Sequence, residues 1–206
     1  MTSKSCNPEP WNPARYLKEY SFYRRPLILG EAPSPTAPDS PWSAGAKSTH
    51  NLVALIYGTS GSHSDLVRDF ELSNVSESHP GKSKSGFSKF DRLPGASTLQ
   101  QLSGDGAFHN RVTFFMGRRV SQALASTDSF EQAIDRRSKL KFKPAAGWID
   151  WVPVESSPNS FGLFMMVPHP QAYFRYGDGN LTELSRLFRL ALGLSPVSKL
   201  GAFRSR

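Results

Sequence analysis

The apolar and polar positions of this chain predict several short strands separated by helices. Unbroken apolar runs occur at 27–29 and 161–167, and further candidate strands span 70–75 and 111–116. A short apolar run without alternation is typical of a strand buried on both faces, as in a parallel sheet. The segment 148–154 alternates loosely and contains a proline, which predicts a strand at the edge of the sheet.

Between these strands, apolar residues recur at helical spacing. The clearest helix spans 181–192, with Asn180 as its predicted N-cap and Gly193 as its stop. Another is predicted over 49–57, with Ser48 as its N-cap. The remaining predicted helices span 13–22, 95–103, 118–125 and 129–138.

Alternation of strands and helices indicates the α/β class. We expect a three-layer α/β/α sandwich around a central, mostly parallel four-stranded sheet. The chain has 206 residues, which suits one domain of about 150–200 residues with short ends. That domain is predicted over 13–195, between a flexible tail at 1–12 and a basic tail at 196–206.

The composition narrows the expected partners. The formal net charge is +8, and a basic domain most often binds a polyanion, usually nucleic acid. No apolar run reaches the roughly 18 residues of a membrane span, and the N-terminus lacks the apolar segment of a secretory signal. Cys6 is the only cysteine, which excludes an internal disulfide. We therefore expect a cytoplasmic, nucleoid-associated monomer that binds DNA and no membrane.

Polar side chains follow three of the predicted strands. Glu31 comes directly after the first strand, Asn74 ends the second and His169 follows the strand at 161–167. The carboxyl ends of parallel strands share one edge of a sheet, which is where open α/β folds bind their ligands. A carboxylate, an amide and an imidazole at one edge indicate a hydrolytic site.

Taken in order, these segments resemble the uracil-DNA glycosylase superfamily. Gly30-Glu-Ala-Pro-Ser34 is similar to the first motif of that family, written G-E-A-P-G in its iron–sulfur branch. Ser73-Asn-Val75, before the basic loop at 79–86, is similar to a strand end that is often T-N-V. His169-Pro-Gln-Ala-Tyr173 is similar to the second motif, H-P-S followed by a wedge residue. The resemblance covers about 25–192.

The resemblance implies hydrolysis of the N-glycosidic bond between a base and deoxyribose, on a base flipped out of the helix. Glu31 would orient or deprotonate the attacking water and stabilise the cationic sugar. Asp39 is a rival for that role, because some branches place their acid further along this loop. His169, as a neutral imidazole, would donate a hydrogen bond to the departing base.

The resemblance also implies contacts to the base and to the DNA. Asn74 would read the edge of the base, Trp42 would stack on it, and Ala32 lies on the same turn. Tyr173, with Phe174 and Arg175, would fill the gap that the flipped base leaves in the duplex. The predicted DNA-binding residues are Ser48, Lys82, Lys84, Arg118, Arg119, Gln171, Tyr173 and Arg175.

The chain departs from the family pattern at several positions. Cys6 alone cannot supply the four cysteines of an iron–sulfur cluster, so we expect no cofactor and no metal. Gln171 replaces the usual serine after His-Pro, and Ser34 replaces the last glycine of the first motif. The tyrosine that shields the pocket from a 5-methyl group has no counterpart. This leaves room for a modified pyrimidine, as in phage DNA, and hence for DNA repair or antiviral defence.

Three alternatives to a glycosylase are a P-loop, a zinc site and a DNA-binding module without catalysis. Gly45-Ala-Lys-Ser48 is not a P-loop, because that motif needs adjacent Gly-Lys and an earlier glycine. A zinc site is not indicated, because the histidines lack metal-ligand spacing. The open alternative is a DNA-binding module that keeps the glycosylase fold without catalysis.

Overall fold

The computed structural model describes the central part of the chain, and for 150–157, 160 and 161 it describes the backbone alone. The described residues are 17, 22–31, 42–76, 101–102, 105–117, 120, 150–157, 160–197, 200 and 203. In chain order the elements are β1 (Leu27–Gly30), α2 (Lys47–Tyr57), the 3-10 helix η1 (Gly58–Ser60), α3 (His63–Asp69), β2 (Glu71–Asn74), β3 (Val112–Met116), β4 (Asp150–Ser157), β5 (Ser160–Val167), the 3-10 helix η4 (Pro170–Arg175) and α7 (Asp178–Ala191).

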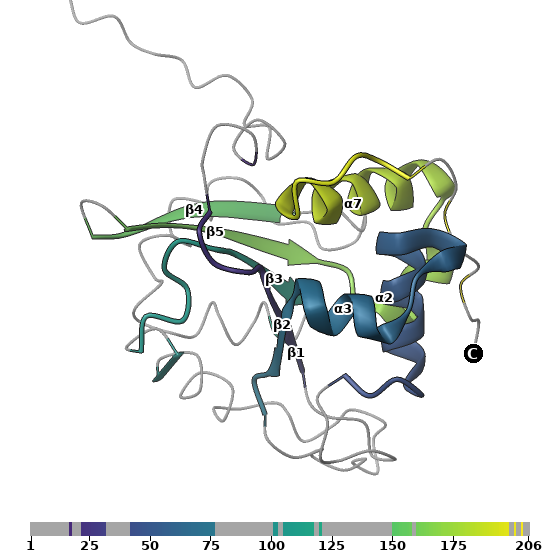
Figure 1. The fold of residues 1–206 in the computed structure, drawn as a ribbon, viewed down its shortest axis with the longest axis horizontal. Helices are drawn as coiled ribbons and strands as arrows, with labels where there is room; N and C mark the ends of the chain where they lie inside the picture. Colours follow the sequence, from purple (N-terminus) through teal and green to yellow (C-terminus); the bar gives the residue numbers. More distant parts are fainter. Residues whose placement is uncertain are drawn as a thin grey trace, which may run out of the picture.

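A single sheet organises these elements, with the strand order β2-β1-β3-β5-β4 (Figure 1). β1 pairs in parallel with both β2 and β3, and β3 pairs in parallel with β5. β4 runs antiparallel to β5 at the edge, where its proline was predicted to place it. The prediction of an α/β fold around four parallel strands is therefore confirmed, and β4 adds a fifth strand.

Side chains of the central strands alternate between two apolar clusters on the two faces of the sheet. On the first face, Ile28 and Phe114 pack with buried residues of α2, α3 and α7, which gather on one side of the sheet (Figure 1). The rings of Phe114 and Phe188 stack there with centroids 4.0 Å apart. On this face, β1 and β3 therefore pack against α2, α3 and α7.

The second face has its own aromatic core. Phe108, Phe115 and Phe164 contact one another there, with the Phe115 and Phe164 ring centroids 5.0 Å apart. Leu27 and Leu29 of β1 belong to the same cluster. Burial on both faces confirms that β1 is a central strand. The helices predicted at 13–22, 95–103, 118–125 and 129–138 lie largely or wholly outside the described residues.

Two of the predicted helix starts are wrong. α2 begins at Lys47 after the extended residue Ala46, so Ser48 lies inside the first turn and is not its N-cap. α7 begins at Asp178 after Gly177, so Asn180 is likewise inside the helix. Neither helix has a side-chain cap bond, and the extended backbone conformation before the helix decides where it begins.

The chain beyond α7 contacts the core at two described positions. Leu200 and Phe203 pack against the first apolar cluster, and the Phe203 ring lies edge-on to Tyr173 with centroids 5.9 Å apart. Among the described residues, no helix is long and apolar enough to cross a membrane.

Candidate functional site

The carboxyl ends of β2, β1, β3 and β5 form one edge of the sheet. Gly30 pairs with Asn74, Leu29 pairs with Phe115, and Met116 pairs with Val167. Neighbouring strands lie about 4.8 Å apart. The predicted site residues Asn74, Glu31 and His169 therefore follow one another along this edge, and Gly117 comes between the last two.

Glu31 is placed on this edge by main-chain bonds to the segment after β2. The Val75 N–H donates to the Gly30 carbonyl oxygen at 3.0 Å, and the Ser76 N–H donates to that of Glu31 at 3.1 Å. Parallel pairing thus continues past the end of β1. The backbone of the half-buried Glu31 is therefore fixed by hydrogen bonds from the two residues that follow β2.

Asn74 lies across the backbone of Gly30. A Cβ atom at position 30 would be only 2.4 Å from Asn74 Oδ1, so the amide occupies the space that glycine leaves open. Asn74 Oδ1 is buried and has no hydrogen-bond partner in the described part of the chain. A buried acceptor without a partner is costly and uncommon in proteins. Among the described residues, this oxygen therefore lacks the donor that a buried acceptor normally has.

Trp42 packs against the same glycine. Its Cζ2 would be 3.0 Å from a Cβ at position 30, and its Nε1 donates to the Ser73 carbonyl oxygen at 3.2 Å. The side chain is only 4% exposed, and His63 Nε2 lies 2.7 Å from the Trp42 carbonyl oxygen. With its ring buried in this way, Trp42 belongs to the wall beside Asn74 and offers no open ring face for stacking.

His169 is fixed by four neighbours at the end of β5. Its Nδ1 accepts a hydrogen bond from the Gln171 N–H at 3.3 Å. Its Cβ would be 3.0 Å from a Cβ added to Gly117, whose φ of +92° also favours glycine. Pro168 and Pro170 restrict the backbone on both sides. With Nδ1 as acceptor, a neutral ring carries its proton on Nε2, which is then a hydrogen-bond donor.

Asn51 ties helix α2 to the same turn and was not among the predicted site residues. It is fully buried, and its Nδ2 donates to the Pro170 carbonyl oxygen at 3.0 Å. The sequence carries one signal for it: an asparagine that shares the buried helix face with Leu55, four residues on. A polar residue on an apolar helix face needs a buried partner, and here that partner is the carbonyl group beside His169.

The 3-10 helix η4 presents some of its predicted DNA contacts to solvent and buries another. Gln171 and Arg175 are exposed, whereas Tyr173 is fully buried and burial raises the pKa of its hydroxyl. The exposed aromatic residue is Phe174, with 41% of its surface accessible and Arg175 Cζ 5.3 Å above its ring. Of the three residues predicted to fill a gap in the duplex, Tyr173 is therefore a core residue, whereas Phe174 and Arg175 are exposed.

The remaining predicted site residues are only partly described. Ser48 is half-buried in the first turn of α2. The competition between Glu31 and Asp39 stays open, because Asp39 belongs to a segment without description. The site predictions outside the described residues are Ala32, Asp39, Lys82, Lys84, Arg118 and Arg119.

Within the described residues, no group of three or more histidine, cysteine, aspartate or glutamate side chains could hold a metal ion. The chain matches no protein-family model, and no curated protein matches its sequence.

Proposed function

We propose that this protein is a monofunctional DNA glycosylase of the uracil-DNA glycosylase type, acting in the cytoplasm as a monomer. It would flip a uracil or a modified pyrimidine out of DNA and hydrolyse its N-glycosidic bond. The observation that carries the proposal is the buried Oδ1 of Asn74, which has no hydrogen-bond partner among the described residues and lies on the sheet edge that also holds Glu31 and His169.

The amide of Asn74 suits the edge of a pyrimidine. Its Oδ1 can accept from a ring N–H while its Nδ2 donates to a neighbouring carbonyl oxygen. Uracil and its 5-substituted relatives present that donor–acceptor pair side by side. A base in this position would give the buried acceptor its missing partner, which supports base binding at this edge.

The other two groups suit the cleavage step. The transition state combines a cationic sugar with an anionic leaving base, so a carboxylate and a hydrogen-bond donor are needed on opposite sides of the bond. Glu31 supplies the carboxylate, which orients the water and offsets the charge of the sugar. His169 supplies the donor, because its Nδ1 is engaged by the Gln171 N–H and its proton is then on Nε2.

The exposed residues of η4 complete the proposal. Phe174 and Arg175 project beside the His169 turn, where an aromatic ring could fill the gap left by the flipped base. Gln171 is the neighbouring exposed polar group and is assigned to the DNA backbone. The net charge of +8 supports binding to a polyanion.

The test is an incubation of the purified protein with labelled oligonucleotides, single- and double-stranded, that carry uracil or modified pyrimidines. We expect alkali-sensitive abasic sites at one class of base. Glu31→Ala and His169→Ala should each lower the rate about 10²- to 10⁴-fold. Glu183→Ala, on the exposed face of α7, and His50→Ala, on α2, are the matched controls and should keep the wild-type rate.

Salt-sensitive binding without an abasic product from any base would replace this proposal with the non-catalytic DNA-binding module. Binding that does not weaken with salt would contradict a nucleic-acid partner, because neutralised phosphates release counterions.

A further inference from the structure

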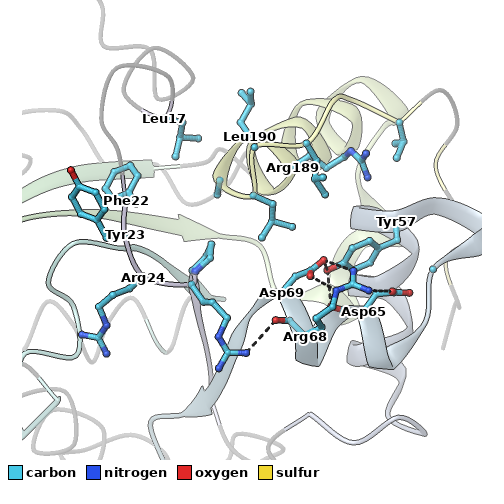
Figure 2. A pocket seen from close by; sticks show the side chains of 18 of the residues that line it. Leu17, Phe22, Tyr23, Arg24, Tyr57, Asp65, Arg68, Asp69, Arg189 and Leu190 are labelled. Carbon is cyan, nitrogen blue, oxygen red and sulfur yellow. Dashed lines mark hydrogen bonds and ion pairs between the residues drawn. The ribbon is translucent and has the colours of Figure 1, made fainter.

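A large open cavity lies at the amino ends of the parallel strands, opposite the edge that carries Glu31 and His169. Figure 2 shows the side chains that line it. The cavity has a volume of about 1020 Å³ and forms where β1 begins and where α2, α3 and α7 end. This is at the upper end of the range for ligand pockets, about 300–1,000 Å³. Because parallel strands place the two edges far apart, the cavity is no part of the proposed glycosylase site.

One side of the cavity is apolar. Figure 2 shows Leu17, Phe22 and Leu190 on this side, away from the charged residues of α3. Leu192 and Leu194 of the segment after α7 extend the same wall, and Leu194 keeps 36% of its surface accessible. Aliphatic surface of this kind gains stability when a partner covers it.

On the other side of the cavity, Arg68 forms ion pairs with both Asp65 and Asp69. Arg68 donates to both carboxyl oxygens of Asp69, at 2.7 and 3.0 Å, and to Asp65 at 2.9 Å. The Tyr57 hydroxyl donates to Asp69 at 3.0 Å (Figure 2). Asp65 and Asp69 are the only acidic residues that line the described cavity, and both are paired with Arg68.

Three other arginines of the cavity, Arg24, Arg25 and Arg189, donate to no carboxylate among the described residues. Arg24 donates through Nη1 to the Gly106 carbonyl oxygen at 2.8 Å. Arg25 donates through Nη1 to the carbonyl oxygens of Val67 and Arg68, both at 3.2 Å. Arg189 donates to the carbonyl oxygens of Ile56 and Ser195, the first at 2.8 Å. A carbonyl group orients a guanidinium group but does not neutralise its charge. Each guanidinium group has five N–H donors, so these bonds leave further donors for a ligand. The cavity therefore carries a net positive charge.

We infer that this cavity is a docking site for an acidic peptide segment of a partner protein, with aliphatic side chains on the Leu190–Leu194 wall and separate carboxylates on Arg25 and Arg189. Both halves of the lining are then used, because an arginine fork matches a carboxylate and the leucines bury the aliphatic groups. The inference is independent of the proposed glycosylase activity.

Single-stranded nucleic acid fits this cavity less well. Such ligands need successive aromatic platforms and a continuous track of cations, whereas this wall is mainly aliphatic. Three helices end here, and the partial negative charge at their C-termini opposes a dense row of phosphates. One or two carboxylates carry fewer negative charges than such a row and are therefore repelled less.

The test is fluorescence anisotropy with labelled peptides of about ten residues that combine glutamate and leucine in varied order. Peptides with lysine in place of glutamate are the matched probes, and an oligothymidine of similar length is the competitor. We expect the acidic peptides to bind and the lysine peptides not to bind. Arg25→Glu and Leu194→Glu should each weaken binding about tenfold or more.

Arg186→Glu is the control variant, because Arg186 lies on α7 outside the cavity and pairs with Glu183 at 3.1 Å. It should bind the acidic peptides as the wild type does. Circular dichroism melting of each variant checks folding, and both test substitutions are at exposed positions. Equal binding of lysine peptides, no binding of any acidic peptide, or displacement by oligothymidine that depends on Arg25 would overturn the inference.

Discussion

Asn51 and Pro170 are 119 positions apart and are joined by a buried hydrogen bond of 3.0 Å from the asparagine Nδ2 to the proline carbonyl oxygen. This bond connects α2, which packs against η4, to the turn that carries His169. Pro170 directly follows His169, the proposed hydrogen-bond donor to the leaving base. Loss of this bond should therefore lower the reaction rate more than loss of an equally strong bond elsewhere in the core.

We predict that Asn51→Leu lowers the free energy of unfolding by about 1–3 kcal/mol, because the Pro170 carbonyl group loses a buried donor. It should also lower kcat about 10- to 100-fold with little change in KM, since a displaced His169 affects the transition state. Ser185→Ala is the matched control: the Ser185 hydroxyl donates to the Leu55 carbonyl oxygen at 2.6 Å, also in the core.

Urea unfolding and steady-state kinetics check this prediction. Ser185→Ala should lose stability in the same range and keep the wild-type kcat. Equal losses of kcat in both variants would mean that Asn51 acts on stability alone. The ¹⁵N shifts of the His169 imidazole give a second readout that does not depend on activity, because they report which ring nitrogen carries the proton.

Gly30 gives a second prediction, because its missing side chain makes room for Asn74. Gly30→Ala would place Cβ 2.4 Å from Asn74 Oδ1 and 3.0 Å from Trp42 Cζ2. We expect a destabilisation of about 1–3 kcal/mol from this overpacking and loss of base binding, since the amide must move. Gly45→Ala is the control: its Cβ would meet nothing within 4 Å.

Thermal melting and binding to an oligonucleotide with the preferred base measure both effects. Gly45→Ala should stay within about 0.5 kcal/mol of the wild type and bind normally. If Gly30→Ala bound the base as tightly as Gly45→Ala, Asn74 would have no part in base recognition.

The first apolar strand and its polar turn could be predicted from the sequence because their signals are local. An unbroken run of aliphatic residues indicates a strand buried on both faces wherever it occurs, and β1 is buried on both faces. Pro153 excludes a central position for β4 in the same direct way. The placement of Glu31, Asn74 and His169 on one edge then follows from parallel pairing, whereas their order along it depends on the strand order.

Other features depended on contacts that sequence spacing does not report. Helix α3 was missed, although Ser62 and Asp65 form a capping box, which is a readable start signal. Tyr173 and Phe174 are adjacent aromatic residues, and only the packing of η4 decides that the more polar tyrosine is buried and the phenylalanine exposed. Asn51 could not be predicted to fix the His169 turn, because its hydrogen-bond partner, the Pro170 carbonyl oxygen, is 119 positions away.

Gly117 and Gly193 give a third prediction, because both have positive φ, +92° and +68°, and only Gly117 touches a site residue. Alanine at either position should cost about 1–2 kcal/mol of backbone strain. At Gly117, the new Cβ would also be 3.0 Å from the Cβ of His169.

We therefore expect Gly117→Ala to lower kcat about tenfold or more while Gly193→Ala leaves it unchanged, with similar losses in melting temperature. Differential scanning calorimetry and the glycosylase assay measure the two quantities. A loss of kcat in Gly193→Ala would trace the effect to general destabilisation.

The ion pair of Glu71 and Arg111 gives a prediction about pH. Arg111 is only 2% exposed, its Nη2 donates to Glu71 Oε2 at 2.7 Å, and its Nε and Nη1 have no partner among the described residues. The Arg111 hydrogen bond lowers the pKa of Glu71 below its ordinary value of 4.5, against a smaller opposing effect of burial. The carboxylate is therefore the one described partner of a buried positive charge.

A carboxyl group whose pKa is lower in the folded state contributes stability above its unfolded pKa and loses that contribution as the pH falls through the folded value. We expect stability to decline below about pH 5, partly through Glu71. Glu71→Gln should lower stability at neutral pH by about 1–3 kcal/mol. This is less than for a fully buried pair, because the Glu71 side chain is 44% exposed.

Urea unfolding of the wild type and Glu71→Gln across the acidic range measures both effects. The difference between the two proteins should shrink as the pH falls, because a protonated Glu71 no longer compensates Arg111. Glu183→Gln, which breaks the exposed pair with Arg186, should stay within about 0.5 kcal/mol of the wild type at every pH. If the stabilities of the wild type and Glu71→Gln differed by the same amount at every pH, the charge of Arg111 would be compensated by a group other than Glu71.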